Sequence, residues 1–177
     1  MEQTETFLYA EDRRGAVTSD SMFREFAPYV GRIALRLLGR EDEVDDLVQE
    51  VFLVAWRSAD SIRDPVATRA WLATITVRKA RARLRSRRFW SMLGRDEPMD
   101  YEALAGPEAS PEQRALLAEV YAVLDRLPAN QRMAWTLRVV EGEKLDAVAV
   151  MCGCSLATAK RWILDAHEAI KREVGDG

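Results

Sequence analysis

Apolar residues recur at spacings of three and four along most of the chain, which is the period of an amphipathic helix. A first stripe spans residues 23–38, and Gly39 is suited to end the helix that this stripe predicts. Pro28 fits a helix best in or near its first turn, so the start of this helix is left open. A second stripe spans residues 44–55, and the N-terminal part of its opposite face is acidic. The residues expected to point inward are Phe23, Phe26, Val30, Ile33, Ala34, Leu37, Leu38, Val44, Leu47, Val48, Val51, Phe52 and Ala55.

A third helix is expected to begin at Asp64-Pro65, because a capping residue followed by proline suits a helix start. It continues past Trp71 into a stretch rich in arginine. Residues 90–110 contain glycines, prolines and acidic residues without a helical stripe, which is typical of a linker.

After the linker, Ser110-Pro111 again combines a cap with a first-turn proline and predicts a helix that ends before Pro128. The next helix is expected over residues 129–141, with Gly142 as its stop. Its expected inward residues are Met133, Leu137 and Val140.

No segment alternates convincingly between apolar and polar residues, so we predict an all-α protein of two small helical domains joined by an acidic linker. The predicted limits are 1–19 for an N-terminal tail, 20–90 for the first domain, 91–110 for the linker and 111–177 for the second domain.

Residues 145–164 fit a helix-turn-helix, in which two helices meet at a tight turn. Ala149 is the small residue expected at the helix contact, and Gly153 tolerates the positive φ of the turn. Ser155 is suited to cap the second helix by accepting from the amide of residue 157 or 158. The N-terminal end of that helix would enter the major groove of DNA, although a solvated helical hairpin is the alternative. The candidate DNA-binding residues are Ser155, Ala157, Thr158, Lys160 and Arg161.

The net charge of −3 hides separate acidic and basic blocks. Residues 41–50 hold six acids and no base, whereas residues 69–95 hold nine bases and no acid. Because the bases lie on nearly all sides of a helix, a polyanion partner accounts for them most simply. Trp71 is expected in the core, with stacking on unpaired bases as the alternative. The candidate DNA-binding residues here are Arg78, Lys79, Arg81, Arg83 and Arg85.

The acidic block has a different use, because its carboxylates would repel DNA. It suits a protein partner with a basic surface, or it is an ordinary solvated helix face.

Several classes of function are not expected from this composition. No run reaches the ~18 apolar residues of a membrane span, and the polar N-terminus is not a secretory signal, so we expect a cytoplasmic protein. Cys152 and Cys154 are separated by one residue and His167 is the single histidine, so no metal site is expected. There is no phosphate loop or catalytic constellation, so neither an enzyme, a cofactor nor a small-molecule substrate is expected.

These elements in this order resemble the extracytoplasmic-function (ECF) sigma factors of bacteria. The segment 45–56, DDLVQEVFLVAW, resembles the polymerase-binding helix of the family. TRAWL at 68–72 resembles the start of its promoter-melting segment, and LPANQR at 127–132 resembles the opening of its C-terminal domain. The helix-turn-helix follows where the family has one.

The resemblance implies a factor that binds core RNA polymerase and directs promoter-specific initiation. The acidic helix would dock on the β′ clamp through Asp45, Asp46, Gln49 and Glu50. The basic helix would bind the minus-ten element, and the C-terminal domain would lie near the β flap and read the minus-thirty-five element. An anti-sigma partner is also implied.

The sequence departs from the family pattern at the DNA-binding positions. Residues 75–84 read ITVRKARARL, which lacks the usual Asn and Asp and carries Arg78 and Arg81. Trp162 stands where a basic residue is common, and Asp165 and Glu168 interrupt a normally basic run. Two other functions therefore stay open: a stand-alone helix-turn-helix regulator, and a degenerate sigma-like protein-interaction module.

Overall fold

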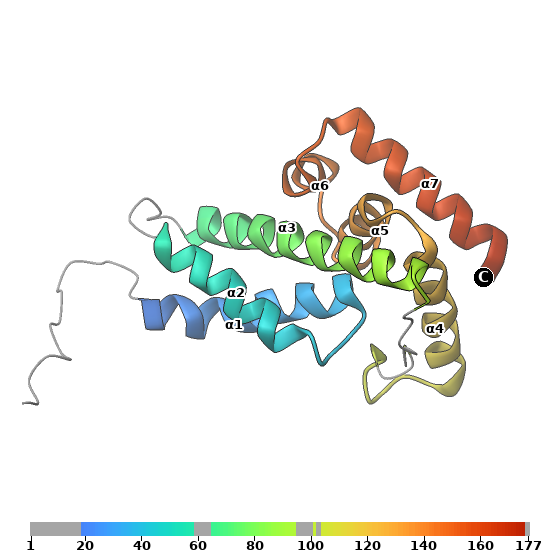
Figure 1. Cartoon of the computed structure of the whole chain (residues 1–177), viewed down its shortest axis with the longest axis horizontal. Helices are drawn as coiled ribbons and strands as arrows, with labels where there is room; N and C mark the ends of the chain where they lie inside the picture. Colours follow the sequence, from blue (N-terminus) through green and yellow to red (C-terminus); the bar gives the residue numbers. More distant parts are fainter. Residues whose placement is uncertain (1–18, 59–64, 95–100, 102–103, 176–177) are drawn as a thin grey trace, which may run out of the picture.

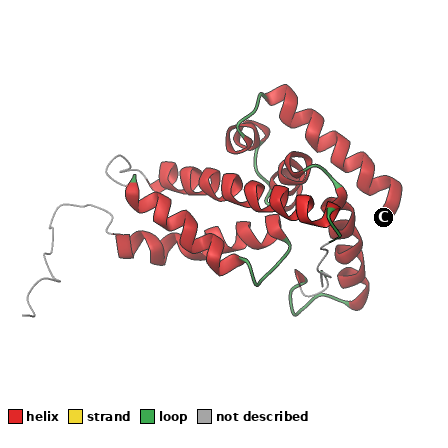
Figure 2. Ribbon diagram, viewed as in Figure 1, coloured by secondary structure: helices red, strands yellow, loops and turns green. Residues whose placement is uncertain are grey.

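The computed structural model describes residues 19–58, 65–94, 101 and 104–175 (Figure 1). These residues form helices and no strand, which confirms the all-α prediction (Figure 2). The elements are α1 (Ser19–Leu38), α2 (Val44–Arg57), α3 (Pro65–Met92), α4 (Pro111–Arg126), α5 (Ala129–Trp135), the π-helical turn η3 (Thr136–Val140), α6 (Leu145–Cys152) and α7 (Leu156–Val174). Of the predicted features, the cap at Asp64 and most of the N-terminal tail lie outside the described residues.

Helix α1 begins earlier than Pro28 alone would suggest. It starts at Ser19 and contains Pro28 in its interior. Proline lacks the N–H that an interior position donates, so the apolar stripe of α1 must hold the helix through packing. Val30 and Ile33 on that stripe are fully buried. As predicted, Gly39 stops α1: the last helical residue is Leu38, and Gly39 has a φ of +68°.

Helices α1, α2 and α3 pack against one another, α1 and α2 through their predicted stripes. Phe23 is the exception, because 38% of it stays exposed and its ring meets Phe52 edge-on at 4.8 Å between centroids. Trp71 is half-buried against the same core, as expected. Helix α3 extends through Met92. The first residues of the predicted linker, from Trp90 to Met92, are therefore helical.

The predicted caps of the second half are present. Ser110 accepts a hydrogen bond from the amide of Gln113, whose side chain accepts one from the Ser110 amide in return. The helix predicted over 129–141 instead divides into α5 and η3. Met133 and Leu137 are buried as expected, but the inward prediction for Val140 is wrong, since 37% of it is exposed. A π-turn takes up more residues than an α-turn and therefore rotates the following side chains away from the core.

The helix-turn-helix forms as predicted from α6 and α7. The chain bends by 98° between them, and Gly153 takes a φ of +65° at the turn. Ser155 caps α7 by accepting from the amide of Thr158 at 3.2 Å. The joint between the two helices is buried at the predicted contact residue Ala149 and at Val148, Cys152 and Ala159, and Cys154 and Trp162 are half-buried beside it.

The two helical regions are in direct contact. Helices α5 and α6 pack on α3 (Figure 1). One apolar core runs from Met22 in α1 to Ala159 in α7. A second core, built around Tyr121 and Leu124, joins α4 to α7. No single described helix has both the length and the apolar character of a membrane span.

Candidate nucleic-acid interface

Three of the four residues predicted to bind polymerase are exposed on the outer face of α2. Asp45, Asp46 and Gln49 are exposed, whereas Glu50 is half-buried. Their position follows from the apolar stripe, which turns Leu47, Val48 and Val51 toward the core and leaves the polar residues outside.

Two large apolar residues extend this face. Leu53 and Trp56 lie four and seven residues after Gln49, so all three share one side of the helix. The exposed fractions of Leu53 and Trp56 are 47% and 44%. Sequence reasoning did not select them, although their absence from the inward stripe was the available signal.

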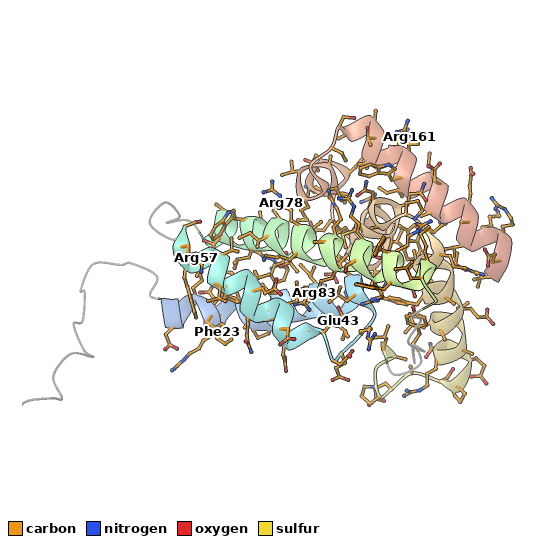
Figure 3. All side chains as sticks on the ribbon, in the orientation of Figure 1. Phe23, Glu43, Arg57, Arg78, Arg83 and Arg161 are labelled. Atoms are coloured by element: carbon orange, nitrogen blue, oxygen red, sulfur yellow. The ribbon has the colours of Figure 1, made fainter. Side chains whose placement is uncertain are left out.

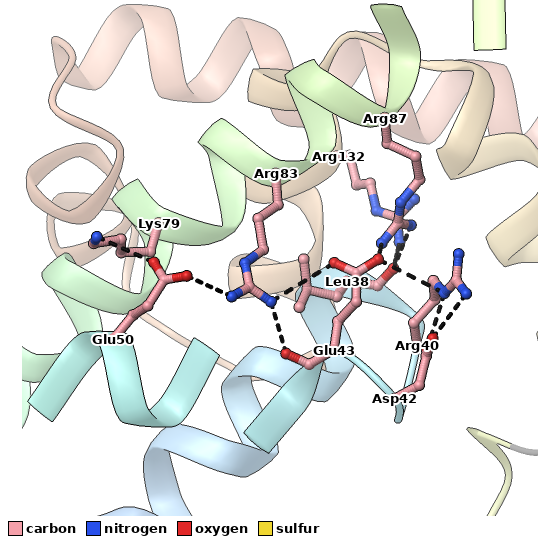
Figure 4. Close-up of polar contacts among 9 residues, drawn as sticks. All are labelled: Leu38, Arg40, Asp42, Glu43, Glu50, Lys79, Arg83, Arg87 and Arg132. Carbon is pink, nitrogen blue, oxygen red and sulfur yellow. Dashed lines mark hydrogen bonds and ion pairs between the residues drawn. The ribbon is translucent and has the colours of Figure 1, made fainter. Parts of the chain in front are cut away.

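Glu50 joins the predicted polymerase face to the predicted DNA-binding helix. Its carboxylate accepts from Arg83 at 2.7 Å and pairs with Lys79 at 3.1 Å (Figure 4). The Arg83 hydrogen bond is the main reason that the pKa of Glu50 lies below its usual value, with burial opposing the shift. Sequence reasoning assigned these residues to two separate partners and did not anticipate that they would pair with each other.

A second set of contacts fixes the start of α2 and the end of α1 on α3. Arg87 donates to the Glu43 carboxylate at 2.7 Å and to the Leu38 carbonyl at 3.0 Å (Figure 4). Arg83 donates to the Glu43 carbonyl at 2.8 Å. Neither Glu43 nor Arg87 was a predicted site residue.

The predicted DNA-binding bases of α3 point in three directions. Lys79 and Arg83 face α2, as Figure 3 shows for Arg83 beside Glu43. Arg81 is turned toward the second helical region, where it donates to the carbonyl of Cys152. Arg78 and Arg85 are exposed. The structure therefore leaves two of these five bases on the open surface.

Helix α7 presents its predicted DNA-binding end to solvent. Ala157, Lys160 and Arg161 are exposed, and Arg161 lies on the outer side of α7 (Figure 3). The hydroxyls of Ser155 and Thr158 share a 2.8 Å hydrogen bond beside them. This arrangement suits contacts to phosphates and base edges.

The atypical residues of α7 have different positions. Trp162 packs against the core, so an apolar residue is needed there in this chain. Asp165 accepts a hydrogen bond from Gln131 at 3.1 Å. Glu168 is exposed and follows Arg161 by seven residues, so the two lie on the same side of the helix. An acid on that side weakens attraction to phosphates.

Two family models match separate parts of the chain. The family description "Sigma-70 region 2" matches residues 22–89, and "Sigma-70, region 4" matches residues 117–169. The ECF RNA polymerase sigma-E factor of Escherichia coli K12 is 32% identical over 75% of this chain and 74% of its own length. The chain belongs to the ECF sigma factor family.

Two other relatives agree with this membership. The sigma factor EcfG of Rhodopseudomonas palustris is 35% identical over 75% of the sigma factor described here and 72% of its own length. SigE of Mycolicibacterium smegmatis is 29% identical over 95% of this chain, which spans 66% of that relative.

Two solved structures share the fold of this sigma factor. RpoE of Bartonella quintana, solved with the anti-sigma factor NepR, has a TM-score of 0.62 at 24% identity, over 88% of this chain and 95% of its own. CnrH, solved with the cytosolic domain of CnrY, has a TM-score of 0.60 at 22% identity, over 89% and 90%.

The cysteines of this sigma factor belong to the packing of region 4. Burial raises the pKa of the Cys152 thiol to about 11 and also raises the pKa of Cys154. Both thiols are therefore protonated at neutral pH and weak as nucleophiles or metal ligands. Among the described residues, no group of three or more His, Cys, Asp or Glu side chains has the arrangement of a metal site.

Proposed function

We propose that this sigma factor binds core RNA polymerase through the outer face of α2 and reads promoter DNA through α3 and α7. The observation that carries the proposal is the presence, in one sigma-family chain, of an exposed acidic helix face and an exposed basic end of a helix-turn-helix. The protein acts in the cytoplasm as a binding factor and catalyses no reaction of its own.

The polymerase contact of region 2 is a mixed polar and apolar surface. Asp45, Asp46, Gln49 and Glu50 are its polar residues, and they suit a partner with a basic surface, for which we propose the β′ clamp. Leu53 and Trp56 supply the apolar area that usually contributes most of the affinity at such interfaces. This surface explains why two large apolar side chains are exposed beside a row of acids.

The DNA contacts divide between two helices. Arg78 and Arg85 offer charges to the minus-ten region directly. Lys79, Arg81 and Arg83 contribute there only after exchanging their internal partners for phosphates. In region 4, which would lie near the β flap, the minus-thirty-five contacts are Ser155, Ala157, Thr158, Lys160 and Arg161.

An anti-sigma factor is a further proposed partner. The sigma factor RpoE was solved with the anti-sigma factor NepR, and CnrH, which shares this fold, was solved with the cytosolic domain of CnrY. Region 2 and region 4 pack on each other, so one such protein can contact both regions at once.

The test is co-purification of the tagged protein with bacterial core RNA polymerase, followed by run-off transcription on genomic fragments. We expect a complex and new transcription start sites. Binding without transcripts would favour the degenerate module, and duplex binding by the protein alone, without polymerase binding, would favour the stand-alone regulator.

The docking face is tested by Asp46→Arg. Like charges facing each other across an interface are strongly unfavourable, so we expect polymerase affinity to fall about tenfold or more. Glu119→Arg is the matched control, because it makes the same charge change on an exposed position of α4. Equal affinity of the two variants in the pull-down would exclude the outer face of α2 as the docking surface.

A further inference from the structure

A cavity of about 630 Å³ lies beside the C-terminal half of α3. Its other walls are the start of α2 with the residues just before it, and the end of α4 with the start of α5. Sites that hold a small molecule usually have volumes of about 300–1,000 Å³. Among the described lining residues, Asp46 and Arg83 already have a part in the proposed function, and the others have none.

Guanidinium groups from all three walls line the cavity. They belong to Arg40, Arg83, Arg87, Arg88 and Arg132. The described lining also holds three carboxylates, those of Glu43, Asp46 and Asp125, so five positive charges against three negative ones leave a net charge of +2. Arginine suits phosphate in particular, because its planar guanidinium donates two parallel hydrogen bonds to the oxygens.

Internal ion pairs hold the guanidiniums at the centre of the cavity in place (Figure 4). The Glu43 carboxylate pairs with Arg87 at 2.7 Å, with Arg40 at 3.6 Å and with Arg83 at 3.9 Å. Arg40 and Arg83 each have one further carboxylate partner. Arg132 is fully buried and donates to the carbonyls at the end of α1. Groups that are already fixed bind a ligand at a smaller entropic cost than mobile ones.

Two sides of α3 supply the polar groups of the cavity that are still open to a ligand. Arg88 is exposed and pairs with no described acid. Ser91 follows it by three residues and therefore lies on the same side of the helix. Ser86 and Trp90, four residues apart, share a different side. A ligand that contacts both sides must be elongated, with an anionic group at the end near Arg88.

The other end of the cavity suits a flat ring. Trp90 lines it with 44% of the residue exposed, and its ring contacts Phe89 edge-on at 5.6 Å between centroids. Leu84, Leu127 and Ala129 add aliphatic surface to the lining. Nucleic-acid bases stack on tryptophan whatever their identity, because every base has a π-face.

We propose that this cavity binds a nucleotide, with its base on Trp90 and its phosphates on Arg88 and Ser91. The fixed guanidiniums between these ends supply the positive potential that favours a polyphosphate chain. Such a site goes beyond the binding of promoter and polymerase, because it gives the sigma factor a small-molecule ligand. Its walls come from region 2 and region 4, so the bound nucleotide stabilises the folded chain by mass action.

The test is calorimetric titration of the full chain with ATP, GTP, adenosine and pyrophosphate. We expect saturable binding of both nucleotides. Adenosine and pyrophosphate should bind about tenfold more weakly or worse, since each lacks one half of the contacts. Absence of saturable nucleotide binding would overturn the site. Pyrophosphate that binds as tightly as ATP would overturn the base contact with Trp90, and adenosine that does so would overturn the phosphate contact.

Two variants with matched controls locate the ligand. We expect Arg88→Ala and Trp90→Leu each to weaken ATP binding about tenfold. Arg85→Ala and Phe89→Leu remove the same kinds of side chain from exposed positions of α3 outside the cavity lining, and they should keep the wild-type affinity within about twofold.

An equal loss in Arg85→Ala and Arg88→Ala would show attraction to the basic surface of α3 as a whole and would overturn the cavity as the site. Circular dichroism checks that the helices survive, which we expect because all four side chains are exposed. These titrations contain neither polymerase nor promoter DNA, so their outcome is independent of the proposed sigma function.

Discussion

Glu50 is the residue at which the two predicted surfaces of region 2 meet. Its carboxylate is held by Arg83 and Lys79, and its pKa is lowered mainly by the Arg83 hydrogen bond. A carboxylate with a lowered pKa in the folded state stabilises the fold above its unfolded pKa of about 4.3. That contribution disappears as the pH falls through the lower folded pKa.

We therefore expect Glu50→Gln to lower the free energy of unfolding by about 0.5 kcal/mol at pH 7, a modest value because the pair is partly exposed. The difference from wild type should shrink as the pH falls from 5 toward 3. Urea unfolding followed by circular dichroism across this range measures it. A difference that stays constant with pH would show that the carboxylate charge is not responsible.

For single residues, the sequence predicted whether a side chain is buried or exposed better than it predicted which side chain it pairs with. The inward stripes of α1 and α2 followed from spacing alone, and the exposure of Asp45, Asp46 and Gln49 follows from those stripes. The pairing of Glu50 with Arg83 was not predictable in the same way, because the two residues are 33 positions apart and their approach depends on how α2 packs on α3.

At the scale of elements, α7 combines packing and recognition in one helix. Its buried side is fixed by Ala159, Ala166 and Ile170, and this leaves Arg161 on the outer side. The turn before it was predictable because Gly153 and Ser155 each have a strong local preference. The π-turn after α5 was not, because its widening depends on surrounding packing rather than on a residue pattern, and Val140 was misplaced for that reason.

Arg161→Ala tests recognition by α7 on a promoter identified by run-off transcription. We expect promoter affinity of the polymerase holoenzyme to fall by about 1–3 kcal/mol if Arg161 pairs with a base. Arg172→Ala is the matched control, since it removes the same side chain from an exposed position in the last turn of α7. Footprinting measures both variants, and equal protection of the upstream element would remove Arg161 from the interface.

For the whole molecule, the packing of region 4 on region 2 could not be predicted from the sequence. The helical stripes require a buried partner surface without specifying which one. The contacts that decide the matter join residues far apart in the chain, such as Arg132 with Leu37 and Arg81 with Cys152. The composition of residues 91–110 predicted a linker between the two regions. Two regions joined by a linker can either separate or associate, so the linker does not determine their packing.

The closed arrangement predicts an unequal effect of two similar glycine substitutions. Gly39 and Gly94 have φ of +68° and +72°, so alanine strains the backbone by about 1 kcal/mol at either position. A Cβ at Gly39 would also lie 3.0 Å from Arg132 Nη2, 3.1 Å from Tyr121 Cδ1 and 3.2 Å from Tyr101 Cε1, whereas one at Gly94 meets nothing within 4 Å.

Gly39→Ala should therefore lower the free energy of unfolding by about 1–3 kcal/mol more than Gly94→Ala, because the crowded side chains of region 4 must move. Urea unfolding of the full chain by circular dichroism measures the difference. The same loss in both variants would mean that region 4 does not rest on the end of α1 in solution. A larger loss at Gly39 would mean that this helix end carries region 4 and that the stability of the two regions is coupled there.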